Sequence, residues 1–85
     1  MNREINRIHW KCRRGMREID LLLREFSQNK LESLGQEEIR MLDAILDYDD
    51  QKLFDYIFKG EPIGLEEHEK FIDMHLKNFT QQGNF

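Results

Sequence analysis

Over the first third of the chain, small and apolar residues recur at alternating intervals of three and four: Ile5, Ile8, Cys12, Gly15, Ile19, Leu22 and Phe26. This spacing places all of them on one side of a helical cylinder. The composition also favours helices, because there are ten leucines but no valine and one threonine, and β-branched residues favour strands. A chain of 85 residues has room for one core. We therefore predict an all-α fold, a compact single-domain bundle of about five short helices over residues 1–85.

A glycine interrupts this periodic segment. A mid-helix glycine costs about 1 kcal/mol relative to alanine, and an unbroken helix of about 27 residues would be long for a domain of this size. We therefore expect two helices that meet at Gly15, with a left-handed or strained backbone there. Residues 29–34 lack helical periodicity and are predicted to be a connection.

Three further helices follow. Ser33 stands three residues before Gln36, which is the spacing of a capping box and predicts a helix start. This helix would bury Ile39, Leu42, Ile45 and Leu46. The next should run from about Asp50 to Lys59, because an acidic corner precedes it and Gly60 follows it. A last helix should begin near Leu65 and end before a frayed tail at residues 83–85; its apolar stripe comprises Leu65, Phe71, Ile72, Leu76 and Phe79.

The charge is unevenly distributed along the chain. Residues 1–24 carry seven basic and three acidic groups, a net charge of +4, whereas the remaining 61 residues carry six basic and fourteen acidic groups, a net charge of −8. A basic N-terminal third can steer the protein toward an acidic or phosphate-bearing partner, or it can be a solvated helix face. The single cysteine permits no internal disulfide, so we expect a reducing cytoplasm.

Nothing in the sequence predicts an enzyme. The candidate soft or borderline metal ligands form two pairs, His9 with Cys12 and His68 with His75. A closed zinc site needs four closely spaced ligands, and each pair supplies only two. We therefore expect no metal site. There is also no phosphate-binding loop or nucleophile elbow, and five short helices offer little room for a cleft that would perturb a carboxylate.

The segment from Arg7 to Asp20 is the most informative, because tryptophan, methionine and several arginines stand together in it. This composition is typical of a protein-binding hot spot. If the chain turns at Gly15, Arg14 and Glu18 should lie close together across the turn. In the alternative interpretation, Trp10 and Met16 are core residues and the arginines only solubilise the helix.

Two stretches of sequence, RIHWKCRRGMREID from Arg7 and LDYDDQKLFDY from Leu46, resemble the bacterial succinate dehydrogenase assembly factor family, also called FAD assembly or flavinylation factors. The signature of that family is RGxxE, matched here by Arg14, Gly15 and Glu18. The chain departs from the family pattern where members often have Pro-Phe-Phe after the second helix. Here the residues are Arg24, Glu25 and Phe26, so this helix should end later.

The resemblance implies a protein that binds the flavoprotein subunit of succinate dehydrogenase, with fumarate reductase as a second candidate, and promotes covalent attachment of FAD to it. It implies no catalytic residue, no tightly bound cofactor of its own, no nucleic acid and no membrane insertion. The implied contact centre is Arg14, Gly15, Met16 and Glu18, its flank is Arg7, Trp10 and Arg17, and its neighbouring edge is Asp49, Asp50 and Phe54. For Phe54, a core position is the alternative. From the residues alone, the other candidate function is a small helical nucleic-acid-binding or regulatory domain that uses the basic N-terminal third.

Overall fold

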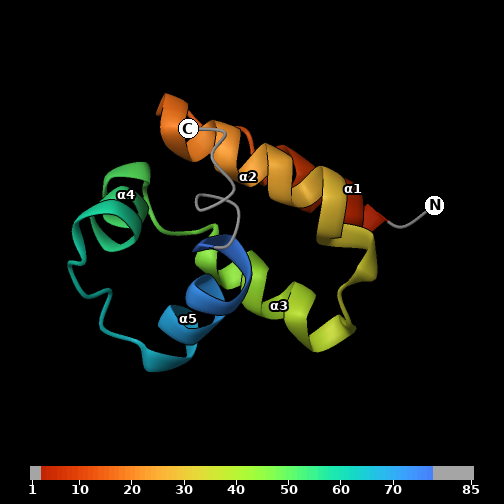
Figure 1. The fold of residues 1–85 in the computed structure, drawn as a ribbon. Helices are drawn as coiled ribbons and strands as arrows, with labels where there is room; N and C mark the ends of the chain where they lie inside the picture. The colour runs from red at the N-terminus through yellow and green to blue at the C-terminus, as the bar shows by residue number, and fades with distance from the viewer. Residues whose placement is uncertain (1–2, 78–85) are drawn as a thin grey trace.

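The computed structural model describes residues 3–77, and this part of the chain is helical without strands (Figure 1). Five α-helices confirm the predicted all-α class; their bounds are α1 Arg3–Lys11, α2 Arg17–Lys30, α3 Gln36–Ile45, α4 Asp50–Lys59 and α5 Glu66–Phe71. A 3-10 turn, η1 Leu31–Ser33, follows α2, and a π-helical turn, η2 Ile72–Leu76, follows α5. None of the described helices is both long enough and apolar enough to cross a membrane.

The helices enclose one apolar core. In Figure 1, α1 and α2 occupy one side of the molecule, and α3, α4 and α5 lie on the other. Helix α2 packs against α4 and η2, and α3 packs against α5. The fully buried side chains come from α1 through η2, and the largest are Ile8, Ile19, Leu22, Leu23, Phe26, Leu31, Leu42, Ile45, Leu53, Ile72 and Leu76. The predicted stripes therefore face the core in α1, α2 and α3.

The break between the first two helices is confirmed, but its geometry differs from the prediction. Helix α1 ends at Lys11, four residues before the glycine. Gly15 does not have a positive φ; in residues 3–77 only Gly60 and Gly64 do. The prediction of a left-handed or strained backbone at Gly15 is therefore wrong, because residues 12–16 form a connecting loop and not a single tight turn.

The connection between α2 and α3 also differs from the prediction. Helix α2 continues through Lys30, as the departure from the family pattern suggested, and η1 takes up most of the predicted connection. The hydroxyl of Ser33 donates to the Lys30 carbonyl at 2.7 Å, so it cannot cap α3. Instead Gly35 is the N-cap, and its amide donates to the Glu38 carboxylate at 2.9 Å. The prediction of a capping box at Ser33 and Gln36 is therefore wrong, because the cap lies two residues later, at Gly35.

Helix α4 has the predicted bounds. The Asp49 carboxylate caps its start by accepting from the Lys52 amide at 2.8 Å, and Gly60 ends it in the left-handed region with φ 75°. In the last helical segment Phe71 is buried as predicted, but Leu65 is 55% exposed because it precedes the first turn of α5. Phe79 and the predicted tail at 83–85 lie outside the described residues.

Candidate functional site

Residues 12–16, hereafter the RGM loop, connect α1 to α2 and contain the Arg14 and Gly15 of the signature. Three successive backbone amides of this loop donate to carboxylates. The Arg14 amide donates to Asp20 on α2 at 2.7 Å. The Gly15 and Met16 amides both donate to Asp50 Oδ2 on α4, each at 3.1 Å. Loop amides would otherwise need water or another partner, so these carboxylates define the path of the loop.

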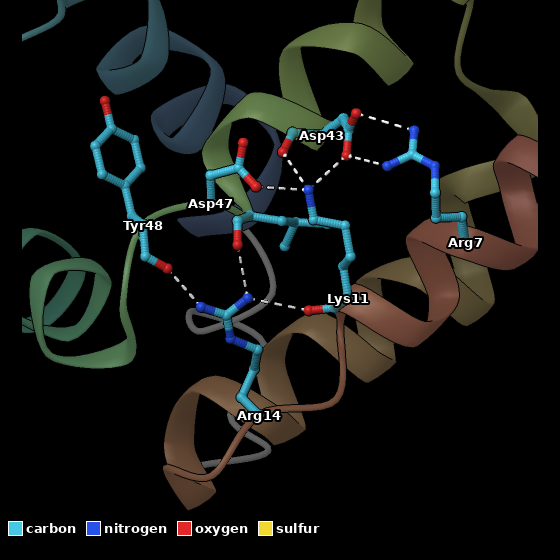
Figure 2. Close-up of polar contacts among 7 residues, drawn as sticks. Arg7, Lys11, Arg14, Asp43, Asp47 and Tyr48 are labelled. Carbon is cyan, nitrogen blue, oxygen red and sulfur yellow. Dashed lines mark hydrogen bonds and ion pairs between the residues drawn. The ribbon is translucent and has the colours of Figure 1, made fainter.

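The Arg14 side chain is turned inward, and only 12% of it is exposed. Its Nε donates to Asp50 Oδ1 at 2.6 Å, and its Nη1 donates to the carbonyls of Lys11 at 3.0 Å and Leu46 at 2.8 Å. Its Nη2 donates to the Tyr48 carbonyl (Figure 2). A guanidinium is well placed there, because the last carbonyls of a helix lack partners and the C-terminal end of its dipole attracts cations.

This geometry corrects the expected pairing of Arg14 with Glu18. The ion pair of Arg14 is with Asp50, which lies 36 residues away in the sequence, and Glu18 is exposed on the first turn of α2. Burial alone would raise the pKa of Asp50, but the hydrogen bonds from Arg14 and from the Met16 amide outweigh it, so the pKa of this carboxyl is lowered. Asp50 is therefore held as a carboxylate that accepts from the loop.

A second charged cluster joins α1 to α3 and to the corner after it (Figure 2). Arg7 makes a two-pronged contact with Asp43 at 2.9 and 3.0 Å, and Lys11 Nζ lies 2.7 Å from both Asp43 and Asp47. Hydrogen bonds from Arg7 and Lys11 lower the pKa of Asp43 to about 2. The basic N-terminal third is thus partly neutralised by acidic residues of the same molecule.

The exposed side of this region carries the remaining cations. The Trp10 side chain is 68% exposed, and the Arg13 guanidinium stacks over its ring at 4.7 Å from the centroid. Arg17 is exposed on α2 and, among residues 3–77, neither Arg13 nor Arg17 forms an ion pair. The core alternative is therefore wrong for Trp10, whereas Met16 is half-buried and packs against the core.

The predicted neighbouring edge lies on α4. Asp49 is exposed and serves as its N-cap. Phe54 is half-buried, packs against the core and lies 4.9 Å, between ring centroids, from the partly exposed Phe58. Phe54 thus contributes to the core while part of it reaches the surface.

Sequence reasoning missed five residues that shape the site: Lys11, Asp20, Asp43, Asp47 and Tyr48. The acidic corner at 47–50 was a visible signal, but it was interpreted as a source of helix caps. Tyr48 also links the corner to α5, since its hydroxyl lies 2.7 Å from Nδ1 of His68.

Cys12 is fully buried, as predicted for a small core residue, and burial raises the pKa of its thiol to about 11. A thiol that stays protonated at neutral pH is a poor nucleophile. In the described part of the chain, no three His, Cys, Asp or Glu side chains are grouped as metal ligands would be.

A small helical fold with a loop fixed from within and an exposed tryptophan beside arginines that form no ion pair is typical of a protein-binding module. The comparison with known families agrees with this class. The model of the Sdh5 family, flavinator of succinate dehydrogenase, matches residues 6–80, and the chain belongs to this family. Its members are assembly factors and not enzymes.

Several relatives are named FAD assembly factor SdhE. The chain is 41% identical over 69 residues to the protein from Legionella pneumophila strain Paris, with 81% of each chain covered. It is 37% identical over 75 residues to the protein from Serratia sp. strain ATCC 39006, with 85% of each covered. With the protein from Yersinia pseudotuberculosis the identity is 42% over 57 residues, which covers 66% of this chain and 65% of the relative. No solved structure matches the chain.

Proposed function

We propose that this chain binds the flavoprotein subunit of succinate dehydrogenase and promotes covalent attachment of FAD to that subunit. The observation that carries the proposal is the family match over residues 6–80, which includes the whole RGM loop and its anchoring carboxylates. Three relatives named FAD assembly factor SdhE share 37 to 42% of the aligned residues with this chain.

On this proposal, the attachment chemistry belongs to FAD and to groups of the flavoprotein. The contribution of this chain is binding. By holding the flavoprotein in a productive orientation, it would raise the effective molarity of the histidine that receives the flavin. The proposal therefore needs no catalytic residue and no cofactor bound tightly to this chain.

The proposed contact surface is centred on the RGM loop. Around the loop, the exposed residues of this surface are Trp10, Arg17 and Glu18, which supply an aromatic anchor and charges of both signs. Gly15 is exposed and lacks a side chain, so a partner backbone could approach closely there. Within the complete proposed set, Arg14 and Asp50 would support the surface from inside the fold, because their side chains are bonded to each other and to neighbouring backbone groups. The set is Arg7, Trp10, Arg14, Gly15, Met16, Arg17, Glu18, Asp49, Asp50 and Phe54.

We extend the proposal in two ways. The flavoprotein subunit of fumarate reductase is a second candidate partner, because it would present the same kind of FAD-accepting domain. The proposed compartment is the bacterial cytoplasm, where a free buried thiol such as Cys12 remains reduced.

The nucleic-acid-binding alternative receives no support from the family match. The charge geometry also weighs against it, since Arg7, Lys11 and Arg14 are paired with carboxylates and their charges are not presented together to a phosphate backbone. We propose that the chain binds neither nucleic acid nor a membrane.

Co-expression of the chain with the succinate dehydrogenase flavoprotein subunit tests the proposal. Covalent flavin should be visible by fluorescence of the denatured subunit, and it should fall markedly when this chain is omitted. Arg17→Glu should reduce this signal, whereas Arg40→Glu, the same change at an exposed position on α3, should not. Equal flavin with and without the chain would refute the proposal.

A further inference from the structure

The second half of the RGM loop is fixed by side chains from other elements: the Cys12 and Arg13 amides donate to carbonyls of α1, whereas the next three amides donate to carboxylates of α2 and α4. Asp50 holds three of its donors, Nε of Arg14 and the amides of Gly15 and Met16, at 2.6 to 3.1 Å. A carboxylate offers about four acceptor positions. Most acceptor positions of Asp50 are therefore occupied by donors of the same molecule.

Asp50 itself is held firmly. It is the first residue of α4, and the preceding residue, Asp49, caps that helix. The Arg14 side chain that pairs with it is also bonded to the carbonyls of Leu46, the C-cap of α3, and Tyr48, in the corner between α3 and α4. The loop is thus anchored on two helix ends that are themselves parts of the folded core.

We infer that Asp50 is a positioning residue, which fixes the backbone of Gly15 and Met16 in the conformation that the flavoprotein subunit recognises, and does not act by touching that subunit. The inference rests on the proposed function. A loop that is ordered before binding does not have to be ordered by the partner, and this raises the observed affinity. If the competent loop conformation becomes only a minor one, the apparent Kd rises by the inverse of its population.

The variants Asp50→Asn and Asp50→Ala test this inference in the full-length chain. Hydrogen exchange of the free chain, followed amide by amide, should become at least about tenfold faster at Gly15 and Met16, whereas core amides such as that of Leu22 should keep their protection. The apparent Kd for the flavoprotein subunit should rise by about tenfold or more, in proportion to the loss of loop order. Asp50→Asn keeps the shape of the side chain and serves where Asp50→Ala does not fold.

Asp73→Asn is the matched control, because it makes the same change in charge and removes a carboxylate that accepts from Tyr56 Oη at 2.8 Å on the π-helical turn. It should change neither loop exchange nor the apparent Kd. If Asp50→Asn loosens the loop but leaves the apparent Kd unchanged, or raises the apparent Kd while the loop stays protected, the inference is overturned. Failure of the wild-type chain to bind the subunit or raise flavinylation would instead refute the proposed function.

Discussion

Arg14 is a signature residue whose side chain serves the fold. Its guanidinium lies between the C-terminal end of α3 and the first carboxylate of α4. Only 12% of the side chain is exposed to solvent. Surface ion pairs at helix spacing contribute only a few tenths of a kcal/mol, but this pair is largely buried and satisfies backbone groups as well. Its removal should therefore affect stability in addition to any effect on partner binding.

Arg14→Ala should lower the free energy of unfolding by about 2 to 4 kcal/mol, because it removes the cation that pairs with Asp50 and leaves three backbone carbonyls without this donor. Urea unfolding followed by helical circular dichroism measures this loss. Arg17→Ala is the control, and it should change stability by less than about 0.5 kcal/mol because Arg17 is exposed and has no ion-pair partner in the described structure. Similar stability of the two variants would contradict the structural role of Arg14.

Substitutions of Gly15 test contact with the partner more directly than substitutions of Arg14, because they should change the stability of the fold less. Its φ is not positive, and a Cβ built there would meet its nearest neighbour, Asp50 Oδ2, at an ordinary 3.8 Å. Gly15→Ala should therefore keep the free energy of unfolding within about 0.5 kcal/mol of wild type. Gly15→Arg should fold as well but lose flavinylation of the partner, because the long side chain occupies the proposed approach path. Full flavinylation with Gly15→Arg would remove this glycine from the contact surface.

At the scale of helices, the sequence predicts a helix end where the candidate end signals agree and not where they compete. Any of Asp47, Asp49 and Asp50 can cap the start of α4, but they lie within four residues of one another and Gly60 marks the end, so the helix has the predicted bounds. Before α3, both Ser33 with Gln36 and Gly35 with Glu38 have the spacing of a capping box. The choice depends on how far the preceding helical segment continues: α2 and η1 together extend through Ser33, whose hydroxyl bonds back to the Lys30 carbonyl, and this leaves Gly35 as the cap.

The end of α4 gives a prediction at this scale. Gly60 has φ 75°, a conformation that costs other residues about 1 kcal/mol because of their Cβ. Gly60→Ala should lower the free energy of unfolding by about 1 kcal/mol, and Gly60→Asn by less, because asparagine tolerates the left-handed region better. Thermal or urea unfolding of the two variants checks this order. An alanine variant as stable as wild type would show that α4 can end in another conformation.

At the scale of the whole molecule, the charge asymmetry of the sequence becomes a set of internal contacts. Three basic residues of α1 and the RGM loop, Arg7, Lys11 and Arg14, meet acidic residues that lie 32 to 36 positions later. The sequence predicted both charged segments and the contact segment. It could not show which charges face each other, because that depends on how α1 is placed against α3. In the described structure, three of the seven basic residues of this segment are exposed without an ion pair, namely Arg3, Arg13 and Arg17.

The cluster of Arg7, Lys11 and Asp43 should make stability depend on acid pH. Asp43 has a folded-state pKa of about 2 against an ordinary value of 3.8, because Arg7 and Lys11 donate to it. A folded pKa below the unfolded one stabilises the protein above about pH 4, and this contribution is lost as the pH falls from about 4 to about 2. The difference in free energy of unfolding between wild type and Asp43→Asn should therefore be constant above about pH 5 and shrink through that window.

Comparing Asp43→Asn with wild type isolates this effect, because the other carboxylates that titrate over the same range contribute equally to both proteins. Urea unfolding at pH 7, 4 and 3 gives the difference at each pH. Glu66→Gln is the control, since Glu66 is 78% exposed and pairs only with Lys70 one helical turn away, at 3.1 Å. That variant should match wild type at every pH, because exposed pairs of this kind contribute little. If Asp43→Asn remained less stable than wild type by the same amount at pH 3 as at pH 7, its effect would come from lost packing, and the ion-pair cluster would not be what ties α1 to α3.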